Sequence, residues 1–175
     1  IKLIVSTQYH RAPLKGTGGV KAIGNYVPGM LPSGDAKKKG FAEIIYLDAA
    51  EEKYVEEVGA ANFFAIINGK MITPKLTGSI LPGITRDSVI HIAKEKLGLD
   101  VEERRISIDE AIAAEEVFCA GTAAIISPIE SIKYNNKEHL FSNGDVGPIT
   151  RELYDILTGI QYGNDKDPFD WIIEL

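Results

Sequence analysis

The chain has 175 residues, of which 45% are hydrophobic and 25% charged, and its formal net charge is −6. This size and composition are typical of one globular domain with its own core, and the negative charge argues against nucleic acid or an anionic membrane surface as the main partner. With no apolar run of ~20 residues and a single cysteine, Cys119, we expect no membrane span, no disulfide within the chain and a reducing compartment.

The first half of the sequence predicts short strands joined by polar turns. We expect strands at residues 1–6, 43–47, 54–59 and 62–67, with a glycine-rich loop at 7–19. Asn68-Gly69 is a strong hairpin signal and predicts a returning strand at 70–73. Residues 25–39 look helical in their charged second half. Prolines and glycines predict a break between residues 27 and 34, because an interior proline costs ~3 kcal/mol.

The second half mixes helices and strands. A helix is expected from about residue 85 to 97, where Gly98 ends it, and an amphipathic helix over 148–160. Ser107-Ile-Asp-Glu110 is a capping box that opens a helix through residue 114. Strands are expected at 101–106, 116–119 and 123–126, with a hairpin tip at Tyr134-Asn-Asn-Lys. Because there is no regular βαβ order, the pattern favours an α+β fold over a doubly wound sheet.

A lysine follows a glycine-rich turn in Lys15-Gly-Thr-Gly-Gly-Val-Lys21-Ala-Ile-Gly-Asn-Tyr26. Glycines let the backbone approach a bulky ligand, and a lysine held there can attack a carbonyl as a free amine. Alone, such a stretch is more often a loop with a solvated charge. It is not the phosphate-binding Gly-x-x-x-x-Gly-Lys-Ser/Thr pattern, because Ala22 follows the lysine. The combination suggests a lysine that forms a Schiff base with pyridoxal phosphate.

Two turns are candidates for binding the phosphate. Gly83-Ile84-Thr85 directly precedes the strongest predicted helix, where unpaired amides and the helix dipole favour an anion. Most Pro-Gly pairs in this position simply begin a helix, so the signal is moderate. Gly121-Thr122-Ala123 offers a weaker second turn with free amides and a hydroxyl.

A pyridine ring also needs an acidic partner for its nitrogen. Glu57, at the end of a predicted strand and before a turn of small residues, is the candidate. We take the neighbouring Glu51, Glu52 and Glu56 as a solvated acidic stretch.

Other kinds of catalytic centre are not indicated. His10, His91 and His139 lack ligand-like spacing, so no metal site is assigned. No Gly-x-Ser-x-Gly or comparable hydrolase motif is present.

These motifs together resemble the class IV aminotransferases that use pyridoxal phosphate, in particular the branched-chain amino acid aminotransferases. The similarity covers roughly residues 11–163. It is carried by Gly16-Thr-Gly-Gly-Val-Lys21-Ala-Ile-Gly-Asn-Tyr26, Tyr54-Val-Glu-Glu-Val-Gly-Ala-Ala-Asn-Phe-Phe64, Leu76-Thr-Gly-Ser-Ile-Leu-Pro-Gly-Ile-Thr-Arg86, Val117-Phe-Cys-Ala-Gly-Thr-Ala-Ala124 and Leu157-Thr-Gly-Ile-Gln-Tyr-Gly163. Five motifs in the family's order are very hard to obtain by chance.

The resemblance implies a role for each candidate residue. Lys21 would carry the cofactor and move the proton, and Glu57 would hold the pyridine nitrogen. Tyr26 would hydrogen-bond the phenolic oxygen, and Leu81 would pack on the ring. The phosphate would be bound by Ile84, Thr85 and Thr122, with Arg11 matching a family arginine near the phosphate. Ala123 would offer its amide to the substrate carboxylate.

The resemblance also implies a fold and a reaction. The fold would be an α/β pseudo-barrel, the large C-terminal domain of the D-amino acid aminotransferase-like, fold type IV enzymes. The reaction would move the amino group of leucine, isoleucine or valine to 2-oxoglutarate in two half-reactions. Two alternatives stay open: another class IV enzyme, such as a D-amino acid aminotransferase or an aminodeoxychorismate lyase, and a non-catalytic scaffold built on a decayed domain.

The family's smaller N-terminal domain is absent from this sequence, which begins without methionine in a predicted strand. We therefore expect residues 1–175 to be a fragment, a single cofactor-binding domain with little or no turnover alone. Family members form dimers, so a homodimer is expected for the full-length protein. The compartment stays open: the cytoplasm for a bacterial protein, a plastid or mitochondrion for a plant one.

Overall fold

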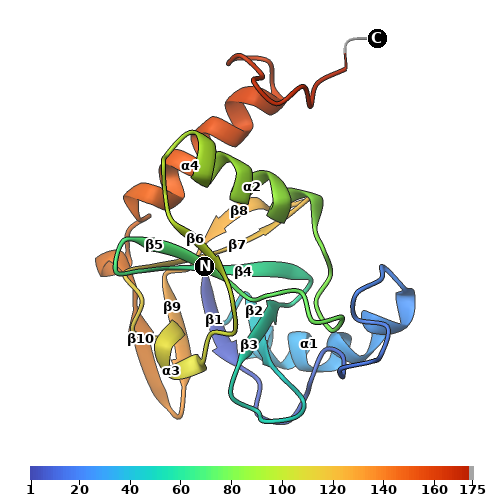
Figure 1. Ribbon diagram of the computed structural model, residues 1–175. Coiled ribbons are helices and arrows are strands. Elements are labelled where there is room, and N and C mark those ends of the chain that lie inside the picture. The colour runs from blue at the N-terminus through green and yellow to red at the C-terminus, as the bar shows by residue number, and fades with distance from the viewer. Residues whose placement is uncertain (174–175) are drawn as a thin grey trace.

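A mixed sheet with helices packed on it forms the computed structural model, which describes residues 1–173 (Figure 1). The strands are β1 Lys2–Val5, β2 Glu43–Leu47, β3 Val55–Val58, β4 Ala61–Ile67, β5 Lys70–Thr73, β6 Val101–Glu103, β7 Glu116–Gly121, β8 Ile125–Pro128, β9 Ser131–Tyr134 and β10 Lys137–Leu140. The helices are α1 Met30–Lys38, α2 Ile84–Glu95, α3 Ile108–Ala111 and α4 Pro148–Gln161, with short 3₁₀ turns η1 Ile23–Asn25, η2 Val27–Gly29 and η3 Ser142–Gly144. No helix in the described part of the chain is long and apolar enough to cross a membrane.

The strands form one branched sheet in the order β10-β9-β1-β2-β3-β4-β5-β6, and β7 joins β4 to β8. Pairing is parallel for β1 with β2 and β9 and for β5 with β6, and antiparallel elsewhere. In Figure 1, α2 and α4 lie together over β7 and β8, while α1 lies near β2. The predicted α+β class is confirmed.

Strand β4 separates two hydrophobic cores. Successive side chains of a strand point to opposite faces, and here both faces are covered. Phe63 packs with β1, β2, β9 and α3, whereas Phe64 packs with α2, α4 and β7. The Phe64 ring stacks on Phe118 with 4.9 Å between centroids. This buried central strand fixes the positions of its neighbours β3 and β7, which carry site residues.

Most elements predicted from local patterns are confirmed. Asn68 and Gly69 adopt positive φ angles of 51° and 72° in the β4–β5 hairpin, and Asn135 and Asn136 do so at 48° and 61° between β9 and β10. These angles fit the two-residue hairpin turns that asparagine and glycine favour. The Ser107 hydroxyl accepts a hydrogen bond from the Glu110 amide at 3.2 Å, as the capping box predicts.

The break predicted between residues 27 and 34 is found only at the start of that range, at η2, which ends at Gly29. Helix α1 begins at Met30 and continues through Pro32 and Gly34, and the irregular part is confined to η1 and η2. Pro32 is tolerated because it lies in the first turn, where an amide has no intrahelical partner. Three other predicted bounds are also wrong: β6 ends at Glu103 and not at residue 106, α3 ends at Ala111 and not at residue 114, and β8 covers Ile125–Pro128 and not residues 123–126.

Candidate functional site

A cavity of about 410 Å³ collects the predicted site residues from three separate segments. Lys21 and Tyr26 come from the segment before α1, Leu81 and Thr85 from the start of α2, and Thr122 from the β7–β8 turn. The other residues predicted for the site that line it are Ile84 and Ala123. The sequence-based candidates thus meet in one place, except for Glu57 and Arg11, which lie beside it.

The register of the sheet aligns three of the residues near this cavity. Glu57 of β3 is opposite Asn62 of β4, and Asn62 is in turn opposite Ala120 of β7. Asn62 and Ala120 line the cavity. The end of β3, the start of β4 and the end of β7 therefore form its floor.

Glu57 is 1% exposed and is held by two side chains. The Arg11 guanidinium donates to Oε2 in an ion pair, and Asn62 Nδ2 donates to Oε1 at 3.2 Å. Burial raises the pKa of Glu57 to about 7, and the cationic Arg11 opposes this rise. Glu57 thus lies at the balance between its neutral and ionised forms near neutral pH, and a further cation or N–H donor beside it would favour the carboxylate.

The start of α2 presents backbone donors to the cavity. Its N-cap residue is Gly83, which has no side chain to cap the first amides. A Cβ at Gly83 would overlap Asn62 Oδ1, so a larger residue there would displace the Asn62 side chain. Ile84 is 85% exposed beside these amides. Uncapped amides at a helix N-terminus, together with the helix dipole, favour an anion.

The loop that carries Lys21 is fastened by Asn25, a buried residue of η1. Asn25 Nδ2 donates to the carbonyls of Thr17 and Val20 at 2.7 and 2.8 Å, and its Oδ1 accepts from the Thr17 hydroxyl at 2.6 Å. Lys21 itself is exposed at the end of this braced loop. The sequence analysis missed this role for Asn25. The only signal in the sequence is an asparagine directly before Tyr26.

A second fixed point of the same loop is Gly18. Its carbonyl accepts from Arg11 at 2.9 Å, and its Cα lies so close to Ser79 that an added Cβ would be 2.6 Å from the Ser79 carbonyl carbon. Arg11 therefore joins Glu57 to the lysine loop. Its contacts are with this carboxylate rather than with the start of α2, where the phosphate is expected.

Two further residues differ from expectation. Asn62, which sequence reasoning missed, joins Glu57 to the carbonyl of Leu81, where its Nδ2 donates at 2.9 Å. An asparagine inside an apolar strand could have drawn attention, because asparagine is depleted in strands.

Glu56 is 5% exposed, so the prediction that it belongs to a solvated stretch is wrong. Its strand is covered on both faces, which sequence alternation alone does not reveal.

The family model for class IV amino-transferases matches residues 2–132. The chain belongs to this family, and the resemblance found in the sequence is confirmed.

Among curated proteins, a probable branched-chain-amino-acid aminotransferase of Staphylococcus epidermidis is 47% identical over 180 residues, covering 99% of this chain and 50% of the relative. Branched-chain amino acid aminotransferase 2, chloroplastic, of Humulus lupulus is 45% identical over all of this chain and 43% of its own length. The chain thus spans about half the length of these relatives.

Solved structures give the same family. The branched-chain amino acid aminotransferase of Escherichia coli superposes with a TM-score of 0.88 at 35% identity, covering 99% of this chain and 57% of that one. The PLP-form of the Thermobaculum terrenum enzyme superposes with a TM-score of 0.84 at 39% identity, covering 94% of this chain and 52% of that one. The class IV aminotransferase fold is confirmed.

Proposed function

We propose that residues 1–175 are the cofactor-binding domain of a branched-chain amino acid aminotransferase, which uses pyridoxal phosphate to move the amino group of leucine, isoleucine or valine to 2-oxoglutarate. The observation that carries this proposal is the meeting of Lys21, Tyr26, the uncapped start of α2 and the Thr122 turn in one cavity. The printed names of the relatives support the substrate class over the D-amino acid and lyase alternatives.

The residues around the cavity fit the three chemical parts of this cofactor. The first amides of α2, with the hydroxyls of Thr85 and Thr122, suit a dianionic phosphate. Glu57, buried and already hydrogen-bonded, suits a pyridine nitrogen that must stay protonated. Lys21 is the amine on the cavity wall that suits the aldehyde. When bound, the cofactor supplies a carbonyl carbon that accepts the amino group and a ring that draws electrons from the substrate α-carbon.

The protein residues then bind, orient and move protons. Lys21 Nζ takes the proton from the α-carbon of the amino acid and returns it to the carbon that receives the nitrogen. Tyr26 would donate its hydroxyl hydrogen to the phenolic oxygen of the cofactor, and Leu81 would pack against its ring. Arg11 favours the ionised form of Glu57 through the ion pair, and Asn62 fixes the orientation of the carboxyl group. Ala123, in the exposed β7–β8 turn, offers its amide to the substrate carboxylate.

Borohydride trapping tests the position of the covalent link. The chain is incubated with pyridoxal phosphate, reduced with borohydride, digested and mapped by mass spectrometry. We expect the phosphopyridoxyl group on Lys21 and its loss in Lys21→Ala, while Lys15→Ala, six residues earlier in the same loop, keeps it. Labelling at another residue, or none at all, would overturn the proposal, and absence in every variant would favour the non-catalytic scaffold.

The substrate class is tested in a single half-reaction. The full-length protein, loaded with cofactor, is mixed with L-leucine or with D-alanine, and the released 2-oxo acid is measured. We expect the branched oxo acid from L-leucine. Pyruvate from D-alanine with none from L-leucine would overturn this part of the proposal.

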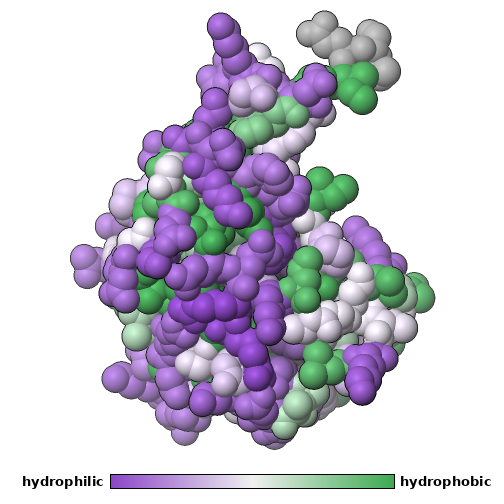
Figure 2. Space-filling model, in the orientation of Figure 1, coloured by the Kyte–Doolittle hydropathy of each residue, from purple (hydrophilic) through white to green (hydrophobic). Residues whose placement is uncertain are grey.

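We also propose that the full-length protein is a homodimer. Support comes from apolar side chains that stay exposed on the segment before α1 and on the first turn of α1, where Figure 2 shows hydrophobic surface at the lower right. They are Val20, Ile23, Val27, Met30 and Leu31. Sedimentation velocity of the full-length protein tests this: a monomer at micromolar concentration would contradict it.

A further inference from the structure

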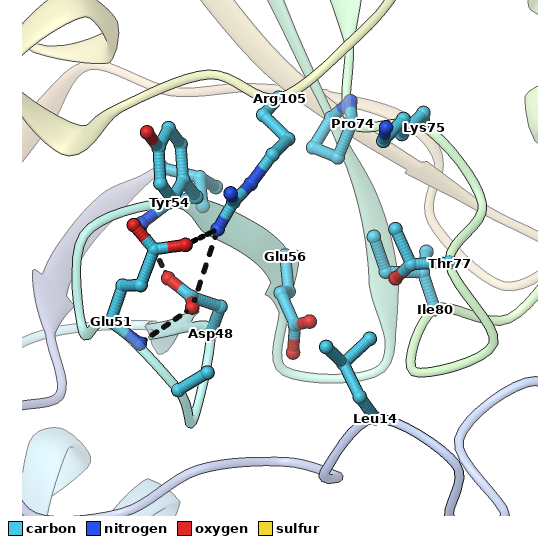
Figure 3. A pocket seen from close by; sticks show the side chains of 12 residues that line it. Leu14, Asp48, Glu51, Tyr54, Glu56, Pro74, Lys75, Thr77, Ile80 and Arg105 are labelled. Atoms are coloured by element: carbon cyan, nitrogen blue, oxygen red, sulfur yellow. Dashed lines mark hydrogen bonds and ion pairs between the residues drawn. The ribbon is translucent and has the colours of Figure 1, made fainter.

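A second cavity, of about 250 Å³, lies on the other face of β3 from Glu57 (Figure 3). Adjacent residues of a strand point to opposite faces, so Glu56 faces this cavity while Glu57 contacts Arg11. Apolar walls come from Leu14, Val55 and Ile80. Its volume is smaller than that of drug-sized pockets, about 300–1,000 Å³, and suits a small metabolite.

Glu56 is the unusual group in this cavity. Its side chain is 95% buried, since only 5% is exposed, and its carboxyl group points into the cavity toward Leu14 (Figure 3). Oε1 accepts a hydrogen bond from the Ser79 hydroxyl, but Oε2 has no partner within residues 1–173. A buried polar atom without a partner costs free energy and is rare in folded proteins. Burial also raises the pKa of Glu56, which a cationic ligand would reverse.

The other acidic groups in the cavity already have partners. Asp48 accepts from the amides of Glu51, Lys53 and Tyr54 at 2.8, 3.1 and 2.8 Å. The Arg105 guanidinium pairs with Glu51 at 2.6 Å and lies 3.5 Å from the centre of the Tyr54 ring.

Two unpaired groups of opposite charge are left within the described residues. Lys75 lines the cavity on the Pro74 side and forms no ion pair with any of residues 1–173. It can therefore meet an anion, while the free Glu56 oxygen can meet a donor. The apolar surface of Leu14, Val55 and Ile80 lies in the same cavity.

From this arrangement we propose that the cavity binds a small zwitterion with an apolar side chain, an α-amino acid, whose ammonium group donates to Glu56 Oε2 and whose carboxylate pairs with Lys75. A simple amine would leave Lys75 unused, and a simple carboxylate would leave the Glu56 oxygen without a donor. The site is separate from the cavity of Lys21, and its occupancy does not depend on the proposed transamination.

The test uses three probes with the same propyl side chain: L-norvaline, butylamine, which lacks the carboxylate, and pentanoate, which lacks the ammonium group. Each is titrated into the cofactor-free chain, and binding is followed by ¹H–¹⁵N NMR of the amides around Glu56 and Lys75. We expect saturable shifts with L-norvaline, and binding of the other two weaker by about tenfold or more, as the loss of one charged hydrogen bond implies.

The variants separate this site from the first cavity. Glu56→Gln should weaken norvaline binding by about tenfold or more, and Lys75→Gln by about threefold or more, whereas Glu95→Gln, an exposed charge on α2, and Lys21→Ala should leave it unchanged. If Glu56→Gln does not fold, Leu14→Trp fills the cavity while keeping Glu56, and it should abolish binding.

Three results would overturn the proposal. They are no saturable norvaline shift near Glu56, butylamine or pentanoate binding as tightly as norvaline, and unchanged affinity in Glu56→Gln or Leu14→Trp. Because no cofactor is present, each is distinguishable from failure of the borohydride test on Lys21.

Discussion

Glu56 and Glu57 are neighbours in β3, yet their carboxyl groups lie in different environments on opposite faces of the strand. Glu57 is paired with Arg11 and Asn62, whereas Glu56 accepts from Ser79 and keeps one oxygen free. Both are buried, and burial raises the pKa of both. Glu57 has a buried cation, Arg11, beside it to stabilise its charge, whereas Glu56 forms no ion pair within residues 1–173.

The raised pKa of Glu57 predicts a pH-dependent stability. The pKa of Glu57 is about 7 in the folded chain and 4.5 in the unfolded chain. Between these pH values the folded state therefore binds more protons than the unfolded state. Stability is then lost as the pH rises, by roughly 3 kcal/mol from Glu57 at about 1.4 kcal/mol per pKa unit. In Glu57→Gln this fall should be absent, as measured by urea unfolding at about pH 5 and about pH 7.5.

The comparison uses the difference in the free energy of unfolding between the two pH values. In Glu57→Gln a neutral side chain faces Arg11 at both pH values, so the substitution lowers stability without adding a pH dependence of its own. Glu95→Gln, an exposed control, should behave like the parent chain. An equal fall in the free energy of unfolding of Glu57→Gln and of the parent would contradict the raised pKa of Glu57.

The lysine loop should not tolerate a methyl group at Gly18. In Gly18→Ala the new Cβ would overlap the backbone of Ser79, and we expect a loss of about 1–3 kcal/mol in stability and slower labelling of Lys21. Gly24→Ala is the matched control, because no atom lies within 4 Å of its added Cβ. Thermal unfolding and the borohydride assay measure both effects, and equal behaviour of the two variants would refute the close packing of the loop.

Thr85→Val tests the anion site at the start of α2. Valine keeps the shape but removes a hydroxyl from the cavity, so pyridoxal phosphate should bind roughly 10- to 100-fold more weakly, the effect of one hydrogen bond to a charged group. Ser88→Ala is the control on the same helix, since its hydroxyl donates to the Ile84 carbonyl at 3.1 Å. Absorbance titration with the cofactor measures the affinity. Unchanged binding in Thr85→Val would show that the phosphate lies elsewhere.

Cys119 should be unreactive in the folded chain. Burial raises the pKa of its thiol to about 12, and the thiolate is the reactive form. We expect slow reaction with an aromatic disulfide reagent at about pH 8 and fast, stoichiometric reaction in urea. Fast labelling of the native chain would mean that β7 opens readily.

Some features were determined by the sequence itself. The turns at Asn68-Gly69 and Asn135-Asn136, the cap at Ser107 and the amphipathic α4 depend on backbone preferences and side-chain spacing within a few residues. The motifs around Lys21 and Thr85 were equally visible, because their glycines and hydroxyls are contiguous. Local chemistry of this kind acts whatever the remainder of the chain does.

Other features were decided only by the tertiary structure. Arg11 meets Glu57 across 46 positions in sequence, and Asn62 reaches Glu57 and Leu81 because β3, β4 and the start of α2 pack together. The burial of Glu56 depends on Ser79 and Leu14, which lie far away in sequence. Whether a strand face is buried or solvated is determined by the elements that pack on it. The contacts between residues that the sheet brings together cannot be predicted from the local sequence.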